Sequence, residues 1–409
     1  MQTSGKLDRS KVMSIESKEY QQRQDEICKI LAAKNLKGVI VVSRGGFTYD
    51  RAYNVFYLTG HYQPYVYLPG NLPHWSGRSH TVLVMSARGE TILCVSTPDC
   101  EKKGIWADKI TYSGDFNQTL ADAMDELNLS SGDVGLIGSD VLPTCHWRFI
   151  VDKFPGINWI EVEAELDTLK RIKSEAEKDC IRSVCALNRR AIDAFYQALR
   201  PGITEADAVA AAYSVAAAEG AAIYFCAVSS GDLVHAYTSK AQPGFSKQIL
   251  SEGDMVKIDL GIVMEGYLSE FGRTYVLGDA SEEQRKLLDT LHAALGTVID
   301  FIKPGASAQE IVACGDSALA SLGVATAEKG SPGQITGSYP VLWGHGLGLG
   351  FERPWLISGE ELTIEEGMYL AVEKFLSLEN VGTAAAEQNL LVGADGAEIL
   401  TDSKEGLWL

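Results

Sequence analysis

The chain has 409 residues and a formal net charge of −18 at pH 7, with 46% hydrophobic and 22% charged residues. This composition is typical of a globular protein, and no apolar run approaches the ~20 residues that are needed to cross a bilayer. A strongly acidic chain repels phosphate backbones, so neither nucleic acid nor a membrane is expected as a partner.

The length of the chain and its first residues indicate the number of domains and the cellular location. A chain of this length exceeds one ordinary hydrophobic core, and we therefore expect two domains. The start, MQTSGKLDRSKVMSIESKEY, is polar and contains no hydrophobic segment of the kind found in secretory signals. We therefore expect a cytoplasmic location.

The first part of the chain has the pattern of an α/β domain. Residues 18–34 form an amphipathic helical pattern, and the apolar stretch GVIVVS that follows predicts a buried strand. Two further strands are predicted in HTVLVMSARGETILCVS, joined by a turn at Arg88 and Gly89. Alternating helix and strand patterns continue from there, so we expect a small α/β domain over residues 1–168.

A long loop rich in proline, glycine and aromatic residues interrupts this domain. Its aromatic residues include Tyr62, Tyr65, Tyr67 and Trp75. This composition indicates an ordered loop rather than a flexible linker. A lid, a dimer contact and a simply packed surface loop all fit the pattern.

A second domain is predicted over residues 169–409. Ser174 is followed by Glu177 at the spacing of a capping box, which predicts the start of a long helix. Two later segments, ALRPGITEADAV (198–209) and FIKPGASAQEIV (301–312), share a helix end, a Pro-Gly pair and a newly capped helix. This internal echo predicts two related α/β halves that are joined back to back.

The stretch VKIDLGIVMEGYLSEFGRT, residues 256–274, places two acidic residues within strand-forming sequence. It predicts a hairpin with a tight turn at residues 264–266. In a regular hairpin Asp259 and Glu270 would then lie opposite each other, with Cβ atoms about 5 Å apart. Two carboxylates at that distance repel each other unless a cation lies between them. The hairpin therefore predicts a cation site.

A second set of candidate ligands follows downstream. Glu373 and Glu387 stand in two apolar strand patterns, and His345 stands in the glycine-rich segment LWGHGLGLGFERPW. Together with the hairpin they give four carboxylates and one imidazole, a hard donor set of oxygen and nitrogen atoms. This set suits two divalent ions, such as Mn, Fe, Co or Zn, with coordination positions left for water.

The order of these residues resembles that of the pita-bread metallohydrolases, which include methionine aminopeptidase, aminopeptidase P, prolidase and the metal-free creatinase. In that family the ligands run Asp, Asp, His, Glu, Glu, and the matching residues here are Asp259, Glu270, His345, Glu373 and Glu387. The first domain resembles the smaller creatinase-type amino-terminal domain, chiefly through NVFYLTG. The resemblance implies an α/β (α+β) protein with a C-terminal pita-bread fold, a pseudo-two-fold repeat and a homodimeric assembly.

The resemblance also implies an activity and catalytic roles. His235, in SSGDLVHAYTS, matches a family histidine that contacts the substrate or an intermediate. Glu373 is expected to handle the proton of the attacking hydroxide, and His235 to steady the intermediate. The implied reaction is metal-dependent hydrolysis of a C–N bond in a small peptide or small amide, as by an Xaa-Pro aminopeptidase or dipeptidase.

Three positions depart from the family pattern. Glu270 replaces the second aspartate, which makes a single-metal or metal-free state conceivable. Glu352 stands where the peptidases carry a histidine, and Ala385 where prolidases carry an arginine. Both changes remove donor or positive character, and Glu352 is predicted to receive a cationic or N–H group of the substrate. The alternatives are a small-molecule amidohydrolase, a creatinase-like amidinohydrolase or a lyase, and a non-catalytic binding module.

Overall fold

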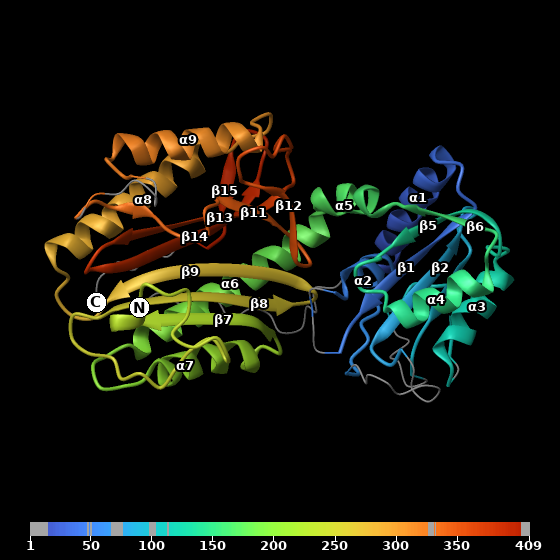
Figure 1. Ribbon diagram of the computed structural model, residues 1–409, viewed down its shortest axis with the longest axis horizontal. Coiled ribbons are helices and arrows are strands. Elements are labelled where there is room, and N and C mark those ends of the chain that lie inside the picture. The colour runs from blue at the N-terminus through green and yellow to red at the C-terminus, as the bar shows by residue number, and fades with distance from the viewer. Residues whose placement is uncertain are drawn as a thin grey trace. The chain divides into compact units, whose positions relative to one another are not determined.

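The computed structural model describes residues 15–46, 49, 51–66, 77–97, 104–112, 114–325, 331 and 333–401. The chain divides into two compact units, the first ending at Lys170 and the second beginning at Arg171 (Figure 1). Each unit combines β-sheets with packed helices. Among the described residues, no helix has both the length and the apolar character that a membrane span requires.

The first unit is a six-stranded mixed sheet with helices. Its strands are β1 (Gly38–Arg44), β2 (His80–Ser86), β3 (Thr91–Cys94), β4 (Lys109–Thr111), β5 (Gly132–Ile137) and β6 (Ile157–Glu161), in the spatial order β4-β3-β2-β1-β5-β6. Its helices are α1 (Ser17–Ala33), α2 (Tyr53–Thr59), α3 (Phe116–Glu126), α4 (Thr144–Lys153) and α5 (Glu163–Arg171). β1 and β2 are buried along nearly their whole length, which explains their unbroken apolar sequences. The hairpin predicted at Arg88 and Gly89 is confirmed, since β2 and β3 pair antiparallel.

The aromatic loop of the first unit is only partly described. Tyr62 stacks on Tyr49 with ring centroids 5.8 Å apart, and the guanidinium of Arg78 lies 4.8 Å from the ring centre of Tyr65. Tyr67 and Trp75 lie outside the described residues. A lid or dimer contact at this loop therefore stays a prediction.

The second unit contains two sheets and two pairs of long helices. The helices are α6 (Glu175–Ala198), α7 (Glu205–Ala218), the short 3-10 helix η1 (Gly231–Leu233), α8 (Glu282–Phe301) and α9 (Ala308–Ser321). A three-stranded sheet consists of β7 (Ala222–Ser230), β8 (Met255–Met264) and β9 (Tyr267–Val276). The larger sheet consists of β10 (Thr336–Gly337), β11 (Gly344–Leu347), β12 (Phe351–Trp355), β13 (Tyr369–Leu378), β14 (Gly382–Val392) and β15 (Ala397–Ile399). Its order is β12-β11-β13-β14-β15, with β10 paired to β13.

The predicted internal repeat is present in the second unit. In Figure 1, α6 and α7 cover the three-stranded sheet, whereas α8 and α9 lie beside β13 and β14 on the opposite side of the unit. Capping boxes open all four helices, and their N-cap residues are Ser174, Thr204, Ser281 and Ser307. Thr204 and Ser307, which cap the second helix of each pair, each form an isolated antiparallel bridge to a later segment. The two halves therefore repeat the same local design.

The two sheets meet along β9 and β14, where side chains take the place of a regular ladder. Thr274 Oγ1 donates to the carbonyl oxygen of Ala385 at 2.9 Å and accepts from the amide of Ala385 at 2.8 Å. Arg273 donates to the main-chain carbonyl of Glu387. This seam holds the acidic strand segments of the two sheets against each other.

Gly315 on α9 reveals a tight contact in the core of the second unit. A Cβ added at Gly315 would lie 2.3 Å from Trp343 Cε2, and Trp343 is 1% exposed. Alanine normally favours a helix over glycine by about 1 kcal/mol, but overpacking against the fixed ring should make Gly315→Ala destabilising by about 1–3 kcal/mol. Denaturant unfolding measures this change.

Gly296 on α8 provides the matched control for that prediction. Nothing lies within 4 Å of a Cβ added there, so Gly296→Ala should stabilise the protein by about 0.5–1 kcal/mol. If both alanine variants stabilised the protein alike, the tight contact at Trp343 would be disproved.

Candidate metal centre

The first two candidate ligands stand on the hairpin of β8 and β9, whose turn consists of Glu265 and Gly266. Both turn residues have positive φ, 53° and 85°, as a two-residue type I′ turn requires. Met264 therefore pairs with Tyr267. The centre of the turn lies between residues 265 and 266.

This turn shifts the register from the predicted one. Asp259 faces Gly272 across the hairpin, and Glu270 faces Gly261. The prediction that the two carboxylates lie directly opposite each other is wrong, because it requires a turn centred between residues 264 and 265, one position before the observed centre. They are instead diagonal neighbours on one face of the sheet, which is still close enough for their side chains to meet. Each carboxylate faces a glycine, so no opposing side chain fills the space between the sheets.

The other three candidate ligands stand on the larger sheet. Glu373 on β13 pairs directly with Glu387 on β14, and His345 on β11 pairs with Ala371 on β13. A Cβ added at Gly272 of β9 would lie 3.4 Å from Glu387 Oε2, so the two sheets approach closely here. The carboxylates therefore meet from both sides of the seam.

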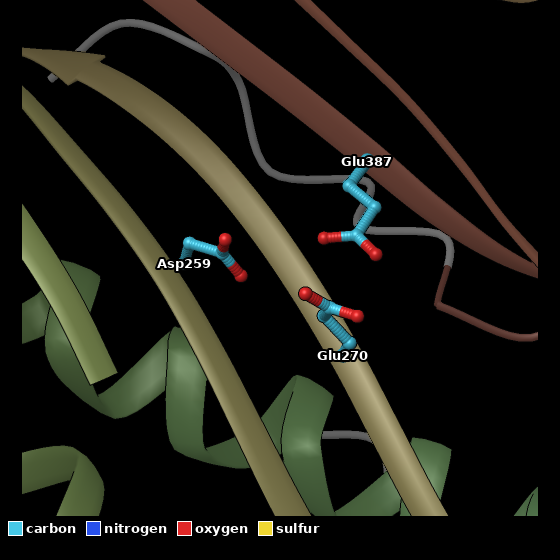
Figure 2. Close-up of side chains that lie close together, drawn as sticks. All are labelled: Asp259, Glu270 and Glu387. Atoms are coloured by element: carbon cyan, nitrogen blue, oxygen red, sulfur yellow. The ribbon is translucent and has the colours of Figure 1, made fainter. Parts of the chain in front are cut away.

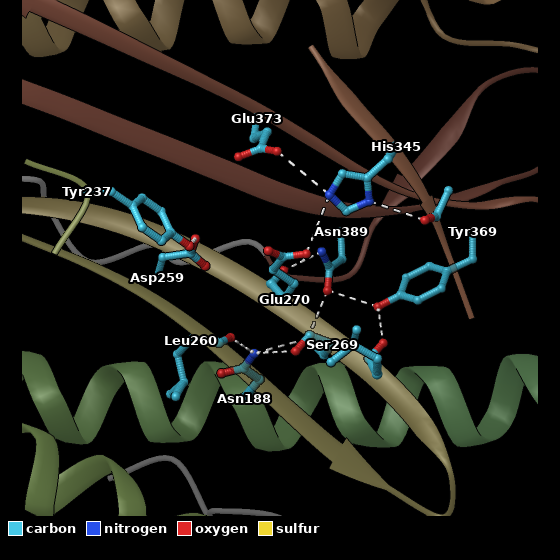
Figure 3. Close-up of polar contacts among 12 residues, drawn as sticks. Asn188, Tyr237, Asp259, Leu260, Ser269, Glu270, His345, Tyr369, Glu373 and Asn389 are labelled. Atoms are coloured by element: carbon cyan, nitrogen blue, oxygen red, sulfur yellow. Dashed lines mark hydrogen bonds and ion pairs between the residues drawn. The ribbon is translucent and has the colours of Figure 1, made fainter. Parts of the chain in front are cut away.

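All five predicted ligand residues converge on one place. One oxygen atom each of Asp259, Glu270 and Glu387 lies within 4.8 Å of the others (Figure 2). His345 Nε2 lies 3.5 Å from Glu270 Oε2 and 3.7 Å from Glu373 Oε1 (Figure 3). The other ring nitrogen of His345 contacts the carbonyl of Gly346 at 3.2 Å. If that nitrogen carries the proton, Nε2 presents a lone pair to the cluster.

The cluster is buried, and several of its oxygen atoms have no hydrogen-bond partner. The five residues are only 2–6% exposed. Within the described part of the chain, Asp259 Oδ1, Glu270 Oε2 and Glu387 Oε1 lack hydrogen bonds. Burial lowers the pKa of His345 to about 4, so its imidazole is neutral, as metal ligation requires. Buried carboxylates without compensation cost several kcal/mol each, so these residues fit bound divalent cations.

Burial and mutual repulsion raise the pKa values of the carboxyl groups. Burial raises the pKa of Asp259 to about 6, against a hydrogen bond from Tyr237 that lowers it. Burial and the charge of Asp259 raise the pKa of Glu373 to about 8. Burial and neighbouring carboxylates raise the pKa values of Glu270 and Glu387 well above the ordinary range. A bound cation would reverse these shifts, because positive charge favours the ionised form.

Tyr237 lies at this centre although no sequence motif predicted it. Its hydroxyl donates to Asp259 Oδ2 at 2.7 Å (Figure 3). Burial and the charge of Asp259 raise the pKa of Tyr237, so the hydroxyl keeps its proton and remains a donor. The side chain as a whole is 44% exposed. The one available signal in the sequence was its place two residues after His235.

His235 lies near β14 rather than among the five clustered residues. Its Nδ1 is 3.4 Å from Thr383 Oγ1, and Thr383 is also hydrogen-bonded to Ser377 at 2.6 Å. The side chain of His235 is exposed. A role in contacting substrate therefore stays a prediction, and the exposure leaves the imidazole accessible.

Glu352 has a cationic partner within the second unit. Lys173 Nζ donates to Glu352 Oε2 at 2.6 Å, and the side chains are 2% and 11% exposed. Glu352 pairs with Gly346 on β11, next to His345. The carboxylate predicted to receive a cationic substrate group is thus already neutralised by Lys173. Its part in catalysis stays a prediction.

A layer of buried polar side chains supports the carboxylates from behind (Figure 3). Asn389 Oδ1 accepts from Ser269 Oγ at 2.8 Å and from Tyr369 at 2.9 Å, while its amide donates to the main chain of Glu270. Asn188 on α6 donates to the carbonyl of Ser269 at 3.0 Å. These bonds tie β9, β13, β14 and α6 together. They explain how groups that repel each other can be held in one place.

Aromatic rings flank His345 on one side. The ring centroid of His345 is 4.8 Å from that of Phe351 and 5.2 Å from that of Trp355. Phe351 is also 5.9 Å from Tyr224. Phe351 and Trp355 are 40% and 36% exposed, so this apolar wall is open to an uncharged group of a ligand.

Comparisons with known families match both units. Residues 179–394 match the family described as Metallopeptidase family M24, and residues 23–172 match the Creatinase/Prolidase N-terminal domain. The first match contains all five clustered residues and His235. The two matches together span most of the chain.

Individual relatives agree with the family matches. A protein named probable dipeptidase PepE from Mycobacterium tuberculosis is 28% identical over 272 residues, which are 66% of this chain and 68% of that protein. A protein named Xaa-Pro dipeptidase from Pyrococcus horikoshii is 26% identical over 251 residues, 60% of this chain and 67% of that one. The solved structure of dipeptidase PepE from Mycobacterium ulcerans superposes with a TM-score of 0.75 at 24% identity, covering 97% of this chain and 99% of that chain. That superposition shows a shared fold.

Proposed function

Because this chain belongs to metallopeptidase family M24, we propose that it is a metal-dependent hydrolase that cleaves the C–N bond of a short peptide, as an Xaa-Pro dipeptidase or aminopeptidase does. One observation carries the proposal: four buried carboxylates and a buried imidazole converge, and several of their oxygen atoms have no hydrogen-bond partner among the described residues. Relatives named dipeptidase and Xaa-Pro dipeptidase support a peptide substrate.

The proposed cofactors are two divalent ions drawn from Mn, Fe, Co and Zn. The residues that would hold them are Asp259, Glu270, His345, Glu373 and Glu387. Two such ions carry the four positive charges that balance four carboxylates, which favours them over a single-metal or metal-free state. Divalent ions in this position supply Lewis-acid polarisation of a carbonyl and lower the pKa of water. A non-catalytic binding module would have no use for so many uncompensated buried charges.

The residues of the chain itself would then orient the substrate and move protons. Glu373 accepts the proton of the attacking water and returns it to the leaving nitrogen. His235 acts as a hydrogen-bond donor to the developing oxyanion or the leaving nitrogen, while Tyr237 keeps its single donated hydrogen bond to Asp259 and orients that carboxylate. Glu352, paired with Lys173, braces the β11–β12 hairpin beside His345 instead of binding the substrate directly.

Metal analysis combined with a peptide assay tests this function. The purified protein should contain about two divalent ions per chain and should hydrolyse Gly-Pro or Ala-Pro. Chelation should abolish the activity, and one of Mn, Fe, Co or Zn should restore it. Full activity in a protein freed of metal would refute the proposal.

A small neutral amide is the second candidate substrate, and the engaged cations favour it. Lys173 pairs with Glu352, while Arg273 and Lys257 donate to main-chain carbonyls. Ala385 offers no cationic side chain, so a free substrate carboxylate has no obvious partner among these residues. Ala-Pro and its C-terminal amide separate the candidates. Faster hydrolysis of the amide would favour a small-molecule amidohydrolase over a dipeptidase. If the protein hydrolysed neither substrate, an amidinohydrolase or lyase would be favoured.

We further propose a homodimer located in the cytoplasm. The dimer is an expectation from the family resemblance, and the aromatic loop near Tyr62 is the proposed contact. Light scattering after size-exclusion chromatography measures the mass in solution. A mass of one chain at micromolar concentration would exclude the dimer.

A further inference from the structure

The loop after η1 carries two hydrogen-bonding side chains, of which Tyr237 reaches the carboxylate cluster and His235 lies beside β14. Tyr237 donates to Asp259 (Figure 3). His235 contacts Thr383 on β14. Both residues lie outside helices and strands. Their positions therefore depend on contacts that the loop makes with the rest of the unit.

Lys257 supplies two of these contacts from within β8. Its Nζ donates to the carbonyl of Val234 at 3.1 Å and to that of Ala236 at 2.9 Å. These are the two carbonyl groups on either side of His235 in the chain. Ser229 Oγ donates to the same Ala236 carbonyl at 3.0 Å.

Lys257 is an unusual occupant of its position, because it is only 2% exposed. Burying an ammonium group costs several kcal/mol unless its hydrogen bonds are satisfied, and an apolar side chain would pack in a strand interior without that cost. The ring centre of Phe375 lies 5.7 Å from Nζ, and Phe375 is also 6.3 Å from the ring of Tyr237. The ring of Phe375 therefore lies near both the ammonium group of Lys257 and the side chain of Tyr237 in the loop.

We propose that Lys257 is a positioning residue that fixes the main chain of residues 234–236, so that His235 and Tyr237 stay directed at the reaction centre. This role rests on the proposed hydrolase function for its kinetic consequence. The hydrogen bonds of Lys257 Nζ go to the two loop carbonyls, which argues against a role in which Lys257 only balances the charge of Asp259.

A mutant cycle tests this role. Lys257→Met keeps most of the side-chain volume and removes the ammonium, and should lower kcat by roughly 10–100-fold with KM and metal content nearly unchanged. In a background that already carries His235→Ala and Tyr237→Phe, the same change should cost less than about threefold, because the positioned side chains are gone. Equal losses in both backgrounds, or loss of metal from Lys257→Met, would overturn the proposal.

Two further variants guard against a folding defect. Lys170→Met removes another buried lysine, in the first unit, whose Nζ donates to Asn54 at 3.2 Å, and should leave kcat unchanged. Ser229→Ala removes only one donor to the Ala236 carbonyl and should lower kcat by a few-fold, with the same non-additivity. A Ser229→Ala enzyme with unaltered kcat would count against the positioning role even if Lys257→Met does not fold.

A crystal structure of Lys257→Met separates this proposal from the proposed function. If the wild-type protein cleaves no peptide or amide, the hydrolase function fails, but the positioning role can still be decided. Movement of the Tyr237 hydroxyl to more than 3.5 Å from Asp259 would support it. An unmoved loop would overturn it.

Discussion

Replacing Glu387 by glutamine should strip the centre of its ions and lower kcat/KM on the order of 10³-fold or more. Glu387 is 2% exposed, and it contributes one of the three oxygen atoms that lie within 4.8 Å of one another. Glutamine keeps the shape but cannot supply the negative charge. Because a bound ion contributes several kcal/mol to the transition state and 1.4 kcal/mol is tenfold in rate, a loss of this size follows. Elemental analysis and kinetics with Ala-Pro measure the two effects.

The same substitution should stabilise the protein when no metal is present. Burial and neighbouring carboxylates raise the pKa of Glu387 well above the ordinary range, so the ionised form is unfavourable in the metal-free fold. Thermal unfolding in the presence of chelator tests this sign. Glu379→Gln, at the exposed end of the same hairpin, makes the same charge change and should alter neither metal content nor stability. Retention of metal and activity in Glu387→Gln would exclude this cluster as the metal centre.

Much of the second unit could be predicted from short-range signals. The capping boxes at Ser174, Thr204 and Ser307 were visible in the sequence and form in the structure, because each depends on only four consecutive residues. The echo between two of them indicated the internal repeat. The family membership confirms the pita-bread fold and the creatinase-like first domain that the resemblance implied.

The register of the β8–β9 hairpin could not be predicted as well. It depends on which residues adopt positive φ, and Glu265 does so at 53° although it is not a glycine. Residues other than glycine are uncommon at positive φ, so the strand pattern of the sequence did not indicate that Glu265 is one of the two turn residues. The convergence of Asp259 and Glu270 survived the error, because the actual register still places both on the same face.

The surroundings of the candidate site depend on contacts between distant residues. Lys173 and Glu352 are 179 positions apart in the chain, and no periodicity or motif links them. From the sequence alone, Glu352 was predicted to contact the substrate. In the fold, its carboxylate instead pairs with Lys173. The contacts of Tyr237 with Asp259 and of Lys257 with the loop carbonyls likewise depend on how the loop after η1 meets β8.

Removing the ions should make stability fall as the pH rises. In the metal-free fold burial and the charge of Asp259 raise the pKa of Glu373 to about 8, whereas an unfolded glutamate has a pKa of about 4.3. Between these values the folded state binds a proton that the unfolded state has lost, so the free energy of unfolding decreases with pH. The contribution of protonated Glu373 to stability is complete below about pH 4 and is lost as the pH rises through about 8. Each such carboxyl changes the free energy of unfolding by about 1.4 kcal/mol per pH unit.

The window from pH 6.5 to 8 isolates this effect from other buried groups. Burial lowers the pKa values of His61, His292 and His345 to about 4, so they reduce stability only below about pH 6.5. Burial lowers the pKa of Lys257 to about 8, and this shift raises stability with pH only above that value. Within the window, denaturant unfolding should show a loss of about 2 kcal/mol for each carboxyl that is still protonated at pH 6.5.

With ions bound, stability should change little across the same window, because positive charge keeps the carboxylates ionised in the folded state as well. Glu373→Gln should reduce the slope of the metal-free protein by about 1.4 kcal/mol per pH unit, since an amide does not titrate, whereas Glu379→Gln should leave it unchanged. A metal-free protein of constant stability between pH 6.5 and 8 would mean that the fold does not force these carboxylates together. The repulsion that makes the cluster a site for cations would then be absent.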